Sequence, residues 1–224
     1  MCSLTPLSND PEVMLGYINS LGFELKDAQL SEVFSFDDEM LDFVPKPVYG
    51  VIFLYPIDDS DGVLESRHLH DKVYNGEKPF YTHQTVGNAC GTIALIHVLM
   101  NNLDHVTVKD GSCASKLVRD LPHDDPDGAA KLIEADEELL EAHEDFATND
   151  DAEIPECVMN HFIAFIEFNG DLWELDGRKD NAINHGKCSD LLKDSISVVK
   201  TDFLPHLTNS NEISMTVLCK QLAV

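Results

Sequence analysis

The chain has 224 residues and a mass of 24.9 kDa, which suits one large domain or at most two small ones. Apolar residues make up 43% of it and charged residues 25%, typical values for a soluble globular protein. Its 41 Asp and Glu outnumber its 15 Lys and Arg, which gives a formal net charge of −26. A surface this negative repels phosphate backbones and anionic lipid, so nucleic-acid and membrane binding are excluded and a cationic partner is favoured.

The cysteines and the first residues bear on the compartment. Six cysteines are scattered without a CxxC pair, which is typical of reduced thiols in a cytosolic protein. Residues 1–6 lack the basic and apolar blocks of a signal peptide, and the longest apolar stretch is too short to span a bilayer. We therefore expect a cytoplasmic protein. We expect neither a metal nor a cofactor, because His68-x-His70 has no second ligand pair nearby and Cys157-xxx-His161 is a lone half-site.

The first elements are predicted by local signals. Asp10 is a suitable helix cap and Pro11 a suitable first helical residue, and apolar residues then recur at helical spacing until Gly22. Residues 48–55 are β-rich and apolar on both faces, which predicts a buried central strand. Residues 58–78 are polar and indicate a loop or a short helix.

The segment from Asp120 to Glu156 is strongly acidic, with 15 acidic residues and one Lys. Its portion from 129 to 146 has helical spacing, and Ala147 to Pro155 looks like an exposed loop. Two interpretations are open. The segment is either a solvated helix face with a loop, or an acidic wall beside a binding groove.

The last third of the chain predicts a hairpin, a helix and a strand. Residues 161–168 and 171–175 flank Asn169-Gly170, a strong signal for a two-residue hairpin turn. Residues 190–204 indicate a helix that ends near Pro205, and residues 213–219 indicate a strand.

A candidate nucleophile lies before the apolar helix at 93–100. Asn88 is a plausible helix cap, which places Cys90 in the first helical turn. Free amides and the helix dipole there lower the pKa of a thiol. Gln84 lies six residues upstream and could aim its amide at an oxyanion beside the Cys90 backbone amide, with Asn88 close enough to assist. Taken alone, a cysteine in a glycine-flanked turn is more often a packed small residue.

The hairpin supplies a possible base. A two-residue turn places Asp176 opposite Ile163, so His161 shares a sheet face with Asp176 as its diagonal neighbour. The other face is apolar, and we expect it to be the core, with the pair on the more polar face. A strand-end histidine bonded to backbone is the alternative. A cysteine with a later His and Asp is the constellation of a thiol hydrolase.

Two long segments resemble the ubiquitin C-terminal hydrolase family of cysteine peptidases, in its short single-domain members. They are Gln84-Thr-Val-Gly-Asn-Ala-Cys90-Gly-Thr-Ile-Ala-Leu-Ile-His97, and His161-Phe-Ile-Ala through Glu174-Leu-Asp176-Gly-Arg178-Lys179. The resemblance extends over nearly the whole chain. It implies an oxyanion-hole role for Gln84, the nucleophile at Cys90, the base at His161 and an orienting role for Asp176.

The resemblance also implies a fold. We expect a single catalytic domain over residues 1–224, of α/β (α+β) class, with a papain-like core. A central, mainly antiparallel sheet should be flanked by helices, and the backbone should be knotted.

The same resemblance implies a substrate. A thiol hydrolase of this family removes small adducts or short peptides from the C-terminal glycine of ubiquitin through a thioester on the cysteine. Ubiquitin has an arginine-bearing tail, which suits so acidic a chain. Three segments are implied to contact it: Pro6, Leu7, Ser8, Asn9, Asp10 and Pro11; a crossover loop of Ala147, Thr148, Asn149, Asp150, Asp151, Ala152, Glu153 and Ile154; and Glu212, Ile213, Ser214 and Met215.

Two other functions stay open at this point. The chain could hold free ubiquitin with slow catalysis, or it could act on another ubiquitin-like modifier. Four of the other five cysteines, at 113, 157, 188 and 219, are interpreted as buried or incidental thiols, and His97 as a core residue.

Overall fold

The computed structural model describes residues 4–57, 74, 76–148, 159–207 and 212–222, and its centre is a six-stranded sheet. Neighbouring strands in this sheet are all antiparallel. In spatial order they are β2 (Ala28–Glu32), β8 (Ser214–Lys220), β3 (Val48–Ile57), β5 (Met159–Phe168), β6 (Asp171–Leu175) and β7 (Ile183–Lys187). A separate small sheet pairs β1 (Phe23–Leu25) with β4 (Val106–Val108).

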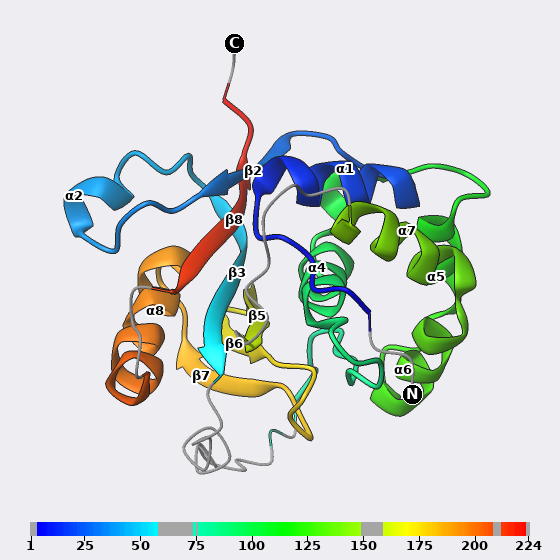
Figure 1. The fold of residues 1–224 in the computed structure, drawn as a ribbon. Coiled ribbons are helices and arrows are strands. Elements are labelled where there is room, and N and C mark those ends of the chain that lie inside the picture. The colour runs from blue at the N-terminus through cyan, green and yellow to red at the C-terminus, as the bar shows by residue number, and fades with distance from the viewer. Residues whose placement is uncertain (1–3, 58–73, 75, 149–158, 208–211, 223–224) are drawn as a thin grey trace.

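Helices cover both faces of the large sheet (Figure 1). One face carries α1 (Pro11–Leu21), α4 (Cys90–Met100), α5 (Cys113–Asp120), α6 (Pro126–Ala135) and α7 (Glu137–Thr148). The other face carries α8 (Leu191–Val198), followed by a π turn, η2 (Val199–Phe203), and a 3-10 turn, η3 (Leu204–His206). The short elements α2 (Asp38–Leu41) and η1 (Leu103–His105) complete the described structure. These layers confirm the α/β class and the antiparallel sheet flanked by helices.

The sheet therefore has two cores, where the sequence predicted one. Ala164, Ile166 and Trp173 pack toward α4, as expected of the apolar face. The opposite face is also buried, since Phe165 and Met215 join Leu192 of α8 in a second cluster. The expectation that the apolar face alone forms the core is wrong, because α8 and η2 cover the more polar face as well.

Local sequence signals correctly predict both ends of α1, the central strand and the hairpin turn. The Asp10 carboxylate accepts hydrogen bonds from the amides of Glu12 and Val13 at 2.7 and 3.3 Å, and α1 ends where predicted, before Gly22. Strand β3 lies between β8 and β5, so it is central as predicted. At the hairpin turn, Asn169 has φ +54° and Gly170 has φ +81°. This left-handed pair confirms the two-residue turn.

The acidic segment differs from its prediction. It forms two helices instead of one, because the chain breaks at Asp136, whose Oδ1 accepts a hydrogen bond from the Leu139 amide at 3.1 Å and starts α7. The predicted loop begins too early, since Ala147 and Thr148 belong to α7 and Ala147 is buried. The rest of that loop, Asn149 to Pro155, lies outside the described residues, as does most of the segment 58–78.

Near the C-terminus the predicted helix is shorter than expected. The α-helix ends at Val198 and continues as the π turn η2 and then the 3-10 turn η3, which contains Pro205. The final strand is confirmed as β8. Among the described helices, none combines the length and the hydrophobicity that a membrane span requires. The knotted backbone stays a prediction.

Candidate active site

Cys90 is the first residue of α4, as the sequence predicted, but the turn before it differs from the expected cap. Asn88 has φ +61°, and its side-chain amide donates to the Leu4 carbonyl at 2.8 Å. Ala89 occupies the cap position and makes no side-chain capping bond. Asn88 therefore fastens the N-terminal segment to the nucleophile turn. The free amides of the first helical turn stay beside the Cys90 thiol.

His161 and Asp176 form the predicted pair. The His161 Nε2 atom lies 2.7 Å from Asp176 Oδ1, and the two side chains are 1% and 3% exposed. The same oxygen accepts a hydrogen bond from the backbone amide of Arg178 at 3.0 Å. On the other side of the imidazole, the Tyr55 ring meets it edge-on, with centroids 5.7 Å apart. The carboxylate can thus set both the tautomer and the tilt of the ring.

The electrostatics of the three side chains favour separated charges. Burial alone raises the pKa of Asp176, but the facing imidazole of His161 outweighs it and holds this pKa below its usual range. Burial would lower the pKa of His161, but Asp176 and Cys90 raise it above the ordinary value. Burial raises the pKa of the Cys90 thiol, yet His161 brings it below normal, with a smaller contribution from Arg178. A thiolate beside an imidazolium is the charge state that these shifts favour.

The contact between the imidazole and the thiol is incomplete in this structure. His161 Nδ1 is buried and has no hydrogen-bond partner of ordinary geometry among the described residues. The two side chains nevertheless interact, because each shifts the pKa of the other. Cys90 and His161 are therefore close enough to interact, but His161 Nδ1 makes no hydrogen bond of ordinary geometry with any residue that the structure describes.

Gln84 lies against the turn that follows Asp176. Its backbone amide donates to the Gly177 carbonyl at 2.8 Å, and a Cβ on Gly177 would come within 3.0 Å of the Gln84 Cβ. Glycine is needed here for this close approach. The side-chain Nε2 donates to the Val86 carbonyl at 3.1 Å, and Oε1 is buried without a hydrogen-bond partner in the described part of the chain. The structure therefore places Gln84 next to the pair, with its amide turned to the backbone.

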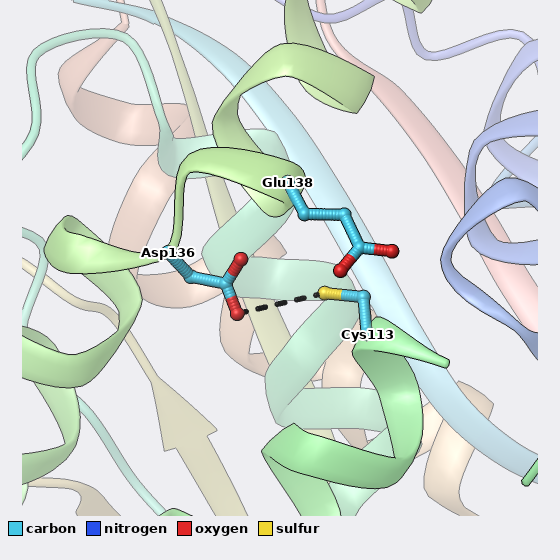
Figure 2. Close-up of side chains that lie close together, drawn as sticks. All are labelled: Cys113, Asp136 and Glu138. Carbon is cyan, nitrogen blue, oxygen red and sulfur yellow. Dashed lines mark hydrogen bonds between the residues drawn. The ribbon is translucent and has the colours of Figure 1, made fainter. Parts of the chain in front are cut away.

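The other described cysteines have the opposite chemistry. Cys113 lies beside two carboxylates (Figure 2), and its thiol donates to Asp136 Oδ2 at 3.8 Å. Burial, Asp136 and Glu138 raise the pKa of Cys113 to about 12. Burial is also the main reason why the pKa of Cys188 rises to about 12 and that of Cys219 to about 11. Of the four described thiols, Cys90 alone has a lowered pKa.

The Cys113 cluster also has the ligand types that metals use. Its thiol and the carboxylates of Asp136 and Glu138 lie within 4.8 Å of one another. Each carboxylate already has a protein partner. Glu138 pairs with Lys116 at 2.5 Å, and Asp136 caps α7. The cluster thus acts as a junction between α5 and α7.

Two of the three implied contact segments lie side by side. The Asn9 side-chain amide donates to the Ser214 hydroxyl, and Thr216 Oγ1 donates to the Asn9 carbonyl at 3.3 Å. Residues 6–11 and 212–215 thereby form one continuous edge. Leu7 and Met215 are buried in the core, so their side chains cannot face a partner. The third segment lies outside the described residues apart from Ala147 and Thr148, which are helical.

Sequence reasoning missed two residues that touch Asp176. Arg178 reaches its carboxylate through the backbone amide, and the Tyr81 hydroxyl donates to its carbonyl at 2.7 Å. Both contacts use a backbone atom, so no sequence motif for a catalytic site predicts them. The position of Arg178, two residues after Asp176, was the only available signal.

Comparison with known proteins decides the family. The model of the family "ubiquitin carboxyl-terminal hydrolase, family 1" matches residues 4–203. The chain belongs to the ubiquitin carboxyl-terminal hydrolase family. Within this family, ubiquitin carboxyl-terminal hydrolase 3 of Arabidopsis thaliana is 37% identical over 200 residues, which are 87% of this chain and 85% of the relative.

Other members of the ubiquitin carboxyl-terminal hydrolase family resemble the chain over its whole length. The human ubiquitin carboxyl-terminal hydrolase isozyme L1 is 30% identical over 221 residues, covering 97% of this chain and 98% of the relative. Among solved structures, the Trichinella spiralis UCH37 catalytic domain bound to ubiquitin vinyl methyl ester has a TM-score of 0.76. Its identity is 18%, and the match covers 98% of this chain and 97% of that one, which shows a shared fold.

Proposed function

We propose that the protein is a cysteine-type deubiquitinating hydrolase, with Cys90 as its nucleophile. It removes small adducts or short peptides from the C-terminal glycine of ubiquitin, and it works in the cytoplasm as a single catalytic domain spanning residues 1–224. The observation that carries the proposal is the buried Cys90–His161–Asp176 set, in which Cys90 is the described thiol with a lowered pKa. Membership of the ubiquitin carboxyl-terminal hydrolase family supports the substrate class.

In the acylation step, His161 holds the proton of Cys90, and the thiolate attacks the carbonyl carbon of the last glycine of ubiquitin. The carbonyl oxygen becomes an oxyanion beside the Cys90 backbone amide and the Gln84 side chain. His161 then gives its proton to the leaving amine or thiol as the bond to the glycine breaks. This leaves a thioester between ubiquitin and Cys90.

In the second step, His161 takes a proton from water, and the resulting hydroxide attacks the thioester. The carbon–sulfur bond breaks and the sulfur leaves as a thiolate beside the protonated His161. The new carboxylic acid loses its proton to solvent, so ubiquitin leaves as a carboxylate. Asp176 keeps the ring oriented through both steps and stabilises its charged form. The Gln84 amide, now bonded to the Val86 carbonyl, must turn away from it to reach the oxyanion.

Charge and surface support a basic partner such as ubiquitin. The net charge of −26 attracts a cationic tail, and the edge formed by residues 6–11 and 212–215 offers a continuous contact surface. Pro6, Asp10 and Glu212 are exposed on it.

The test is release of a fluorogenic amine from the C-terminus of ubiquitin by the wild type and by Cys90→Ala. We expect release by the wild type and none by the variant, with ubiquitin binding retained in both. A matched control is Cys188→Ala, since that thiol is half-buried and has a raised pKa. Release by Cys90→Ala at the wild-type rate would disprove the assignment.

A second function is favoured by the incomplete alignment. His161 Nδ1 lacks a hydrogen bond within the described residues, and the Gln84 amide is engaged with backbone. Because both of these catalytic contacts must still form, this geometry favours slow turnover. A protein that holds free ubiquitin and cleaves slowly is therefore the second candidate. Tight ubiquitin binding together with slow release of the amine would identify it. Activity on another ubiquitin-like modifier would show as release from that modifier and none from ubiquitin.

A further inference from the structure

The turn that follows the orienting aspartate is closed by the aspartate itself. The Asp176 carbonyl accepts a hydrogen bond from the Lys179 amide at 2.9 Å. This closure brings the Arg178 amide to 3.0 Å from Asp176 Oδ1, the oxygen that also faces His161 Nε2. The carboxylate is therefore held in place by its own turn, and any loosening of the turn frees it to rotate.

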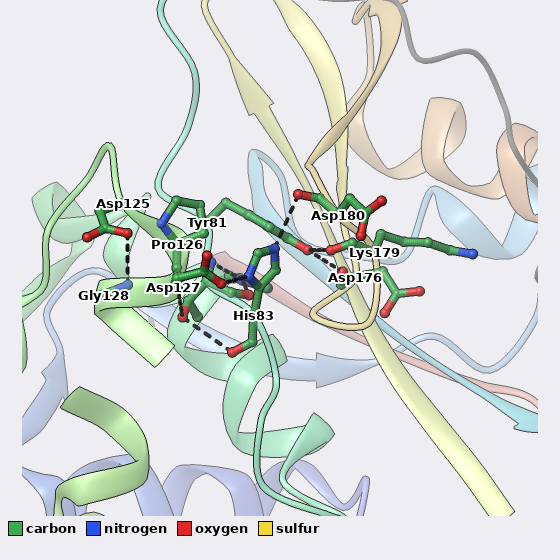
Figure 3. Close-up of polar contacts among 11 residues, drawn as sticks. Tyr81, His83, Asp125, Pro126, Asp127, Gly128, Asp176, Lys179 and Asp180 are labelled. Atoms are coloured by element: carbon green, nitrogen blue, oxygen red, sulfur yellow. Dashed lines mark hydrogen bonds and ion pairs between the residues drawn. The ribbon is translucent and has the colours of Figure 1, made fainter. Parts of the chain in front are cut away.

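Tyr81 holds this turn from outside. Its hydroxyl donates to the Asp176 carbonyl at 2.7 Å and also contacts the Lys179 carbonyl, so it bridges the two ends of the turn. Figure 3 shows the Tyr81 side chain pointing at the turn, with His83 beside it. Burial, with Asp176 and other nearby carboxylates, raises the pKa of Tyr81 far above its usual value. The hydroxyl thus stays a proton donor throughout the working pH range.

The Tyr81 ring is fixed by the helix that carries the nucleophile. It stacks on the His97 ring with centroids 5.2 Å apart and an interplanar angle of 13°. His97 is wholly buried in α4, and its Nε2 lies 3.1 Å from the Thr82 amide. Tyr81 is therefore packed on the helix of Cys90 and bonded to the turn of Asp176.

The neighbouring residue fastens the same segment a second time. His83 Nδ1 lies 2.7 Å from Asp127 Oδ1 at the start of α6, and its Nε2 lies 3.2 Å from the Asp180 carbonyl (Figure 3). Residues 81–84 thus run as a strap between α4, α6 and the 176–180 segment. His83 is half-buried and Asp127 is exposed, so the buried Tyr81 contact is the stronger constraint.

We propose that Tyr81 is a positioning residue, whose hydroxyl keeps the 176–179 turn closed and so holds Asp176 on His161. The turnover part of this inference rests on the proposed function. The thiol chemistry of Cys90 does not, because the charge state of the Cys90–His161 pair exists without any substrate. Loss of the hydroxyl should let the Asp176 carboxylate move away from His161. The pKa of His161 should then fall, and a smaller fraction of Cys90 should be thiolate.

The first test measures the alkylation rate of Cys90 by iodoacetamide against pH, followed by mass spectrometry of the peptide that contains Cys90. The variant is Tyr81→Phe. We expect its alkylation profile to move up by about one pH unit, so that the rate near pH 6 falls roughly tenfold. The matched control is Tyr17→Phe, since the Tyr17 hydroxyl is also buried and hydrogen-bonded, to Thr92 Oγ1 at 2.9 Å, but does not touch the turn.

Tyr17→Phe should lose a comparable amount of thermal stability and keep the wild-type profile. A merely structural role for Tyr81 predicts that both variants lose stability and neither changes the profile. That result would overturn the proposal, and so would an equal shift in both variants.

The second test uses ubiquitin with a fluorogenic C-terminal amide. We expect Tyr81→Phe to lower kcat roughly tenfold with KM changed less than about twofold, because the lost contact acts on the Cys90 pair. An unchanged kcat with a raised KM would contradict this. If the wild type releases no amine while the alkylation profile still shifts in Tyr81→Phe, the proposed function fails and the positioning role stands.

Discussion

The Nε2 atom of His161, on β5, lies 2.7 Å from Oδ1 of Asp176, the first residue after β6. The contact follows from the hairpin, because the turn at Asn169-Gly170 pairs Phe168 with Asp171 and sets the register of β5 and β6. An insertion of one residue in this turn would move Asp176 to the opposite face of the sheet. The alignment of the pair is thus a property of sheet register.

Replacing Asp176 by Asn should remove the charge that favours the imidazolium. The pKa of His161 should fall and that of Cys90 should rise, because each is held by the facing charge. We expect kcat/KM for a ubiquitin C-terminal amide to fall by about two to four orders of magnitude with folding retained. A loss of less than about threefold, in a variant with the wild-type melting temperature, would contradict an orienting role.

Acid should destabilise the protein through its buried neutral histidines. Burial lowers the pKa of His97 to about 4, while an unfolded histidine titrates near 6.5. The unfolded chain therefore binds the proton first, and the contribution of neutral His97 to stability is lost as the pH falls from about 6.5 toward about 4. His143, also lowered by burial, acts in the same direction.

The measurement is urea unfolding of the wild type and of His97→Gln across this range. We compare the free energies of unfolding of the two proteins. The wild type should be more stable than His97→Gln at neutral pH, and this difference should shrink by up to about 3 kcal/mol near pH 4. His161 works in the opposite sense, because its raised pKa stabilises the fold as the pH falls toward 6.5. A stability difference that stays constant with pH would show that His97 titrates normally in the folded state.

Association with ubiquitin should depend on salt. The chain carries a net charge of −26, and steering of a cationic tail weakens as ions screen the field. Between about 0.05 and about 0.5 M NaCl we expect the association rate constant to fall by roughly tenfold and the dissociation rate constant to change much less. Stopped-flow fluorescence with labelled ubiquitin measures both constants. An association rate constant that does not change with salt would show that long-range electrostatic attraction does not contribute to ubiquitin binding.

Asn9→Ala should weaken ubiquitin binding without slowing the chemistry. Asn9 connects the two implied contact segments through Ser214 and Thr216, and it is remote from the Cys90 pair along the chain. Loss of one hydrogen bond of about 1 kcal/mol predicts a rise in KM of roughly fivefold, with kcat nearly unchanged. Asn19→Ala, on an exposed position of α1, is the matched control and should leave KM unchanged.

The nucleophile turn shows where prediction from sequence stops. Cys90 lies in the first turn of α4 as predicted, but the cap on which that prediction was based is wrong, since Ala89 takes the place of Asn88. The Asn88 side chain is used differently. It bonds the carbonyl of Leu4, far away along the chain. A cap would use Asn88 Oδ1 as an acceptor, whereas the bond to Leu4 uses Nδ2 as a donor. The two roles need different placements of the side chain, and only the packing of the N-terminal segment selects between them.

Helix starts and turns can be predicted from the sequence where the residues that specify them are close together in the chain. Asp10 and Pro11 start α1, and Asn169-Gly170 make the turn whose register brings His161 to Asp176. The pairing of His161 with Asp176, and the place of Cys90 in the first turn of α4, were also predicted from sequence. These features depend on backbone geometry over a few residues and on strand periodicity, which the chain carries wherever it folds.

Contacts between segments that are far apart in the sequence depend on the tertiary structure. It buried both faces of the sheet, divided the acidic segment at Asp136, and seated Tyr81 on the turn of Asp176. Backbone atoms make many of these contacts, and every residue has the same backbone donor and acceptor. Residue type therefore says nothing about them until packing has placed the two segments together.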